Sequence, residues 1–168
     1  MKFVRSASLL FCFAALSAVS LSLAADASAD KKADAVKKEL KKFTGKWSIV
    51  SMIRNGNEID AEQLGQLRVI YTEDGKFSVK ADTFEYASGA IKLDPTTKPK
   101  SLEMTFKPND GDEQTFFGIY EIDDKEYRVC HNKNGDKELP KEFASKEGSG
   151  HSLSVMKRDK EEKKEEKK

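Results

Sequence analysis

Histidine and cysteine are the residue types in this chain that most directly suggest chemistry. The chain has two histidines, His131 and His151, and Cys130 directly precedes the first of them. A structural zinc site takes four ligands, so two histidines without a clear third ligand fall short of one. Cys130 lies in the strand-like run EYRVCHNK, where a thiol is usually a small buried hydrophobe rather than a nucleophile. We therefore predict a structural role for Cys130 and no metal site.

Serine and acidic residues give no clearer sign of catalysis. The stretch GSGHS at residues 148–152 lacks the strand–turn–helix setting that a nucleophile elbow requires, and no Walker-type loop is found. Glu58, Asp60 and Glu62 are clustered, but their spacing suits a capped helix better than a calcium loop. We predict a protein that is not an enzyme, with no catalytic residue and no cofactor.

The N-terminus has the three-part layout of a secretory signal peptide. Lys2 and Arg5 precede the apolar run LLFCFAALSAVSLSLA, which is followed by the small and polar residues ADASAD. We expect residues 1–27 to form this signal, with cleavage between Ala24 and Ala29, and the protein to be exported to the periplasm, the cell surface or the medium. The alternative, a membrane anchor, needs about 20 apolar residues, and this run is shorter and contains serines.

The charges are balanced, with 30 basic and 29 acidic residues, so nothing suggests a nucleic-acid partner. Many of the basic residues lie at the two ends of the mature chain. Residues 28–42 are predicted to form a basic amphipathic helix, because Ala33, Val36, Leu40 and Phe43 recur at helical spacing. Residues 159–168 contain no apolar side chain to bury, which predicts a charged, solvated tail.

After the predicted helix, the hydrophobic residues alternate with polar ones, as in half-buried β-strands. Phe77 and Val79 share one face of KFSVKA. Leu102, Met104 and Phe106 share one face of SLEMTFK. Six further runs of this kind bring the total to eight: WSIVSMIR, LRVIYT, GAIKLD, TFFGIYEI, EYRVCHN and HSLSVMKR.

The connections between these runs predict an antiparallel meander, because no segment is long enough for a crossover helix. We favour an all-β, eight-stranded up-and-down barrel over residues 43–158, since closure removes exposed edges, rather than two stacked sheets. Short turns at residues 73–75 and 123–125 would lie at one end. The longer connections 55–66 and 132–150 would lie at the other, and Asp60 is expected to cap a one-turn helix that ends at Gly65.

Several stretches resemble a known family. Gly45-x-Trp47 opens the first strand and Arg158 ends the last one, a pattern similar to the lipocalin signature. More specifically, GKWSIVSMIRNG, IKLDPTTKPKSLEM, GIYEID and EFASKEGSGHSL resemble the small lipocalin-like domain family that is expanded in planctomycete bacteria. The resemblance covers roughly Leu40 to Arg158. It implies a barrel without disulfides whose closed end has a tryptophan packed against an arginine, and it implies no assigned activity.

With that fold, Trp47 is predicted to plug the closed end of the barrel beneath a stacked Arg158, and Gly45 is predicted to let the preceding helix pass close by. Two functions remain open at this point. In the first, the protein is a monomeric, exported, non-enzymatic binding module, not membrane-spanning once the signal is removed, that takes a small hydrophobic ligand. The candidate ligand-binding residues are then Phe77, Val79, Leu102, Met104 and Phe106.

In the second, the core is filled by its own side chains, and the loops at the open end bind an unidentified extracytoplasmic protein. The large inward residues favour a filled centre, with any ligand site shallow and near the open end.

Overall fold

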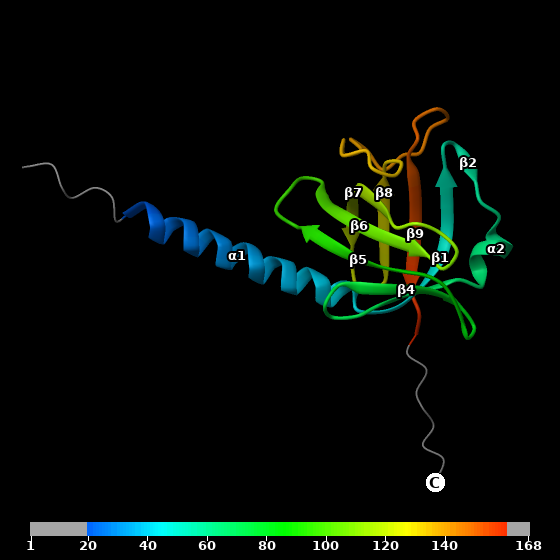
Figure 1. Ribbon diagram of the computed structural model, residues 1–168, viewed down its shortest axis with the longest axis horizontal. Helices are drawn as coiled ribbons and strands as arrows, with labels where there is room; N and C mark the ends of the chain where they lie inside the picture. The colour runs from blue at the N-terminus through cyan, green and yellow to red at the C-terminus, as the bar shows by residue number, and fades with distance from the viewer. Residues whose placement is uncertain (1–19, 161–168) are drawn as a thin grey trace, which may run out of the picture.

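The computed structural model describes residues 20–160, with side chains from residue 30 onward apart from that of residue 61, and these residues form a β-barrel with one long helix projecting from it (Figure 1). The helices and strands are α1 (Ser20–Phe43), β1 (Gly45–Arg54), β2 (Asn57–Glu58), α2 (Ala61–Gly65), β3 (Arg68–Tyr71), β4 (Lys76–Ala81), β5 (Phe84–Asp94), β6 (Lys100–Pro108), β7 (Gln114–Ile122), β8 (Glu126–His131) and β9 (Ser152–Arg158).

The strands pair in the order β1-β3-β4-β5-β6-β7-β8-β9, and every pairing is antiparallel. Pairing of β1 with β9, from Trp47 opposite Arg158 to Arg54 opposite Ser152, closes the ring. The prediction of an eight-stranded up-and-down barrel is therefore confirmed. One end, here called the floor, carries the β3–β4, β5–β6 and β7–β8 turns. The other, here called the mouth, carries the short β4–β5 turn, the β6–β7 connection and the two longest connections, β1–β3 and β8–β9.

Strand β2 lies outside the ring and was not predicted. It pairs with the upper part of β1 through a two-residue turn, in which Asn55 and Gly56 have φ angles of 50° and 85°. Two residues with positive φ form the turn type that joins hairpin strands, and Asn-Gly is its most frequent sequence. The connection continues into the predicted one-turn helix α2, whose N-cap is Asp60; its carboxylate accepts a hydrogen bond of 2.8 Å from the Glu62 amide.

A β-bulge in β1 changes which of its side chains face the interior. Ile49 pairs with Met156, but Ser51 pairs with Val155, so Val50 is the extra residue and is largely exposed. A bulge shifts the inward–outward alternation by one residue. Trp47 and Ile49 point inward before the bulge, and the even-numbered residues of β1 point inward after it.

Helix α1 contacts the barrel through its C-terminal half, from Lys32, which pairs with Asp94 of β5 at 2.7 Å, to Phe43, and its N-terminal half extends away (Figure 1). It begins at Ser20 rather than at residue 28, so it includes residues that we expect to lie in the signal peptide; residues 1–19 lie outside the described part of the chain. Of the predicted stripe, Phe43 is fully buried and Leu40 is partly buried. Glu39 is also buried, where it pairs with Lys100 of β6 and, at 3.2 Å, with Lys42.

The floor is held together by Arg158. Its guanidinium carbon lies 4.2 Å from the ring centre of Trp47, whose side chain is 0 % exposed. The same guanidinium donates hydrogen bonds to three carbonyl oxygens, at 2.7 Å to Thr44, at 2.9 Å to Asp124, and to Lys42. Arg158 thus joins the end of α1, the β7–β8 turn and the indole in one contact.

Glycine at position 45 makes room for Arg158, which is a different role from the predicted one. A Cβ atom at this position would lie 2.8 Å from Nη1 of Arg158, and the φ angle of 121° is one that other residues rarely adopt. The close approach is therefore by the guanidinium of Arg158 and not by the helix.

Above the indole, aromatic rings fill the floor. Phe43 from α1 lies between Tyr71, Tyr120 and Tyr127, with ring centres 5.2–5.4 Å apart. Trp47 meets Tyr127 edge-on at 5.0 Å, and its Nε1 donates a 2.6 Å hydrogen bond to the Phe43 carbonyl. Edge-to-face contacts of this kind stabilise beyond the area they bury.

The long connection after β8 does not simply span the mouth. Part of it covers the outer surface of the barrel, where Phe143 lies 4.3 Å beneath the guanidinium of Arg128 and the Ala144 carbonyl accepts a bond of 3.4 Å from the Cys130 thiol. Cys130 is buried and unpaired with another cysteine, as predicted. Burial also raises the pKa of its thiol, which disfavours the reactive thiolate.

Asp159, expected in the solvated tail, instead belongs to the barrel. Its backbone N–H donates to the Lys46 carbonyl at 2.9 Å, and its carboxylate accepts a hydrogen bond from Ser48 and pairs with Arg68 at 3.0 Å. Asp159 therefore extends the β1–β9 pairing by one residue beyond Arg158. Residues 161–168 of the predicted tail lie outside the described part of the chain.

The floor contact predicts a specific pattern of stability changes. Trp47→Ala should lower the free energy of unfolding by about 3–5 kcal/mol, as for other buried aromatics. Arg158→Ala should lower it by about 2 kcal/mol, because three carbonyls, two of them partly buried, lose a donor and the indole loses its cover. The double variant should lose less than the sum, measured by urea unfolding, with Trp47→Phe as the milder replacement if the alanine variant does not fold.

Arg128→Ala is the matched control for this cycle, because Arg128 also stacks on an aromatic ring but is largely exposed. It should cost less than about 1 kcal/mol and be additive with Trp47→Ala. Additive losses for Trp47 and Arg158 would contradict the shared contact.

Candidate functional site

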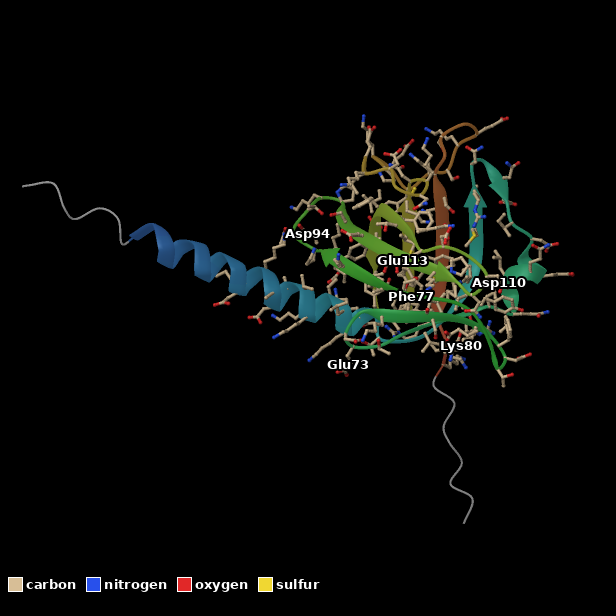
Figure 2. The ribbon with its side chains drawn as sticks, in the orientation of Figure 1. Glu73, Phe77, Lys80, Asp94, Asp110 and Glu113 are labelled. Atoms are coloured by element: carbon tan, nitrogen blue, oxygen red, sulfur yellow. The ribbon has the colours of Figure 1, made fainter. Side chains whose placement is uncertain are left out.

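A cavity of about 760 Å³ occupies the barrel between the floor and the mouth. All five residues predicted to bind a ligand line it: Phe77, Val79, Leu102, Met104 and Phe106. Figure 2 shows Phe77 among the strands of the barrel and Glu73 at its lower margin. The expectation of a filled centre with only a shallow site is therefore wrong, because the cavity reaches Tyr71 and Tyr127 at the floor.

Two of the large side chains in the lining pack against each other and leave the interior open. Phe77 and Phe106 stack on each other with ring centres 6.4 Å apart and an interplanar angle of 27°. The absence of a side chain at Gly89 makes room for Phe77, since a Cβ there would lie 2.7 Å from its ring. With Met104 and Leu102 they form a continuous apolar wall over β4, β5 and β6.

One side of the cavity is closed by the segment between β1 and β3 rather than by a strand. Strand β3 pairs with only the lower part of β1, from Gly45 to Ser48. Higher up, Ile59, Leu64 and Leu67 from the β2–α2–β3 connection line the cavity. A short β3 thus widens the interior, and the hydrophobic face of α2 closes the resulting gap.

At the floor of the cavity, two tyrosine hydroxyls satisfy each other. The hydroxyl oxygens of Tyr71 and Tyr127 are 2.8 Å apart and buried. Burial raises the pKa of Tyr71 to about 12, against a smaller lowering by the hydrogen bond from Tyr127, and burial also raises the pKa of Tyr127. Trp47 lies beneath this pair and is not among the residues that line the cavity.

The mouth has a polar corner formed by three neighbouring strands. Arg54 of β1 is opposite Ser152 of β9, and Ser152 is opposite His131 of β8, so the three residues form one row across the sheet. All three line the cavity. Arg54 faces the cavity because of the bulge at Val50, since unbroken alternation from Trp47 would point it outward.

The position of His131 is set by its neighbours on β7 and β8. Gly118 lies opposite it, and a Cβ at Gly118 would lie 2.9 Å from the Cβ of His131. The imidazole lies 4.7 Å from the Phe116 ring, and its Nδ1 is 2.8 Å from the Asn132 carbonyl. Burial lowers the pKa of His131, and the charges of Arg54 and His151 lower it further.

Sequence reasoning considered His131 only as a metal ligand and missed this corner. The strand pattern could have predicted that His131 faces the interior. His131 follows Tyr127 and Val129 at intervals of two, so it belongs to the inward face of β8. Ser152 is likewise in phase with Ser154 and Met156 on β9.

Other kinds of site were also considered. Among the described side chains, no group of three or more His, Cys, Asp or Glu residues is placed to hold a metal ion. Within residues 20–160, no helix is both long and apolar enough to cross a membrane. No family model, characterised protein or solved structure matches the chain. The resemblance to the lipocalin-like domain family therefore stays a prediction.

The buried tyrosine pair predicts a loss of stability in alkaline solution. An unfolded tyrosine ionises near pH 10, whereas Tyr71 in the folded barrel ionises at about pH 12. Its contribution to the free energy of unfolding is therefore complete below pH 10 and is lost as the pH rises through 12. Urea unfolding between pH 8 and pH 11 should show a shallower decline for Tyr71→Phe than for the parent protein.

Tyr86→Phe is the control for this measurement, because Tyr86 is largely exposed on β5. This variant should keep the decline of the parent protein. An unchanged decline in Tyr71→Phe would show that Tyr71 does not remain protonated in the folded state above pH 10.

Proposed function

We propose that this protein is an exported, non-enzymatic binding module that holds a small, largely apolar molecule inside the barrel. The observation that carries the proposal is the cavity of about 760 Å³, which lies within the range of about 300–1,000 Å³ typical of small-molecule sites. Its walls are mostly aliphatic and aromatic side chains from β1, β3–β9 and the β2–α2–β3 connection.

The hydrophobic effect would supply the binding energy. Each Å² of apolar surface that ligand and cavity remove from water contributes about 25 cal/mol. The apolar wall of Phe77, Val79, Met104 and Phe106 is only partly satisfied by the protein itself, because three of these four side chains are only partly buried. A ligand that covers them would complete their burial, whereas a filled core would leave nothing for a ligand to cover.

A role in binding rather than catalysis is supported by the chemistry of the lining. The Ser152 hydroxyl has no hydrogen-bond partner among the described residues, and so no base activates it. His131 uses Nδ1 for a contact with a backbone carbonyl. The polar groups of the cavity are suited to hold a ligand and not to assemble a nucleophile with its base.

A neutral fluorescent probe, N-phenyl-1-naphthylamine, tests this proposal. It should bind the parent protein with an increase in fluorescence and saturate at one molecule per chain. Val79→Phe should weaken binding at least about tenfold, because the added ring occupies space inside the cavity. Ser78→Phe, the neighbouring outward position on β4, is the matched control and should bind as the parent protein does.

Two results would contradict the binding function: a folded parent protein that does not bind the probe, or equal weakening in both variants. The fluorescence of Trp47 reports separately on the floor of the barrel. Because Trp47 is buried below the cavity, its emission should be blue-shifted in the free protein.

Export is supported by the sequence layout of residues 1–27 and is tested separately. Protein recovered outside the cytoplasm should begin between Ala25 and Asp30, as determined by N-terminal sequencing. Replacing Phe11 by Asp within the apolar run should keep the protein in the cytoplasm. Exported protein that retains Met1 would contradict the proposed signal peptide.

A further inference from the structure

We propose that the ligand is an amphiphile with an anionic head group, and that the head group binds at the mouth corner formed by Arg54, Ser152 and His131 while the apolar body fills the cavity below. This inference rests on the proposed binding function and specifies its ligand class. The three residues are here called the head-group site.

The register of the sheet brings the head-group site together. Directly opposite residues on neighbouring antiparallel strands have Cβ atoms about 4.5–5.5 Å apart. Arg54, Ser152 and His131 are such neighbours on β1, β9 and β8, and all three line the cavity. One carboxylate or sulfonate is large enough to contact all three side chains at this spacing.

Ser152 has a hydroxyl in this corner whose hydrogen-bonding capacity is unused. Its side chain is buried, with the residue 4 % exposed, and its hydroxyl has no hydrogen-bond partner in the part of the chain that the structure describes. A buried hydroxyl without a partner costs free energy, and most such groups in proteins have one. An acceptor oxygen on a ligand in the cavity would provide that partner.

The charge of the lining determines the sign of the head group. Arg54 and Lys133 line the cavity, and none of the lining residues is Asp or Glu. Neither cation forms an ion pair within residues 20–160, although nine other ion pairs do form there. The side-chain hydrogen bond of Arg54 goes to the Met52 sulfur at 3.9 Å. An anion is therefore the head group that this corner would stabilise.

Acidic residues do occur near the mouth, but none of them lines the cavity. Glu58 of β2 lies opposite Ile53, and Glu147 lies beside Gly56. Asp110, Asp112 and Glu113 belong to the β6–β7 connection, and Figure 2 labels Asp110 and Glu113. Within residues 20–160, none of these carboxylates forms an ion pair with Arg54.

The polarity of the walls fixes the orientation of the ligand. From mouth to floor, β1 presents Arg54, Met52 and Ile49, and β8 presents His131, Val129 and Tyr127; β9 presents Ser152, Ser154 and Met156. These three strands change from polar to apolar with depth, whereas β4–β6 are apolar throughout. The floor hydroxyls pair with each other. A head group is thus bound at the mouth, with the tail directed downward.

Three probes with the same twelve-carbon chain test the charge: dodecanoate, dodecanol and dodecyltrimethylammonium, each used below its micelle concentration to displace N-phenyl-1-naphthylamine. Dodecanoate should bind at least about tenfold more tightly than dodecanol, and the cation should bind most weakly. Arg54→Gln and Ser152→Ala should weaken dodecanoate binding far more than dodecanol binding, and so remove most of this preference. Arg128→Gln, on the outer face of β8, is the matched control and should keep it.

The outcomes separate the two proposals. If the protein binds N-phenyl-1-naphthylamine but has equal affinity for dodecanoate and dodecanol, the head-group site is overturned and the binding function stands. A dodecanoate preference that survives Arg54→Gln would also overturn it. Failure of every probe to bind would overturn both proposals.

NMR titration of His131 gives a readout that a merely structural role would not change. The chain has only two histidines, so His151→Gln assigns the signals. The charged groups that act on the imidazole are Arg54 of β1 and His151, which precedes β9, while β7 presents the uncharged Phe116 and Gly118. Bound dodecanoate should raise the pKa of His131, because a carboxylate stabilises the protonated imidazole. An unchanged pKa with dodecanoate bound would place the head group elsewhere and overturn the inference.

Discussion

Closure of the barrel depends on the contact between Arg158 and Trp47, where the last strand meets the first. A single guanidinium covers the indole and donates to the carbonyls of Lys42, Thr44 and Asp124, so the end of α1, the start of β1 and the β7–β8 turn are joined at one point. Without this contact, the carbonyls of Lys42, Thr44 and Asp124 would lose a hydrogen-bond donor where the first and last strands meet. Because the contact is local to the floor, the upper strands need no comparable cross-linking, and the barrel can remain open at its other end.

The difference between a tightly packed floor and an open mouth accounts for the cavity. The aromatic side chains that could have filled the interior are instead gathered at the floor, where Phe43 packs among three tyrosines. Above them the barrel is wide on one side, since β3 pairs with only the lower part of β1, and α2 closes the gap with Leu64. The tightly packed aromatic residues are thus at one end and the open cavity at the other. Strands β1, β8 and β9 change from apolar residues near the floor to polar residues at the mouth, whereas the lining residues of β4–β6 are apolar throughout.

The strand pattern was readable from the sequence because the period of two is strong in β4 and β6, whose inward residues Phe77, Val79, Leu102, Met104 and Phe106 could be named and line the cavity. Three features depended on longer-range geometry. The volume of the cavity depends on Phe77 and Phe106 lying against each other along the wall, which composition does not reveal. The inward position of Arg54 depends on a bulge that reverses the alternation in β1. The row that joins Arg54 to Ser152 and His131 depends on the register of strands far apart in the chain. The extra strand β2, by contrast, was signalled by Asn55-Gly56 and was overlooked.

Both ends of the barrel domain leave from the floor. Helix α1 enters there through Phe43, and β9 ends there at Arg158, while the mouth faces the opposite direction (Figure 1). Any attachment made through either end, whether a fused protein, an affinity tag or a solid support, therefore leaves the mouth facing the surrounding solution. Coupling through the C-terminal side would therefore orient every copy in the same way and leave the entrance of the cavity unobstructed.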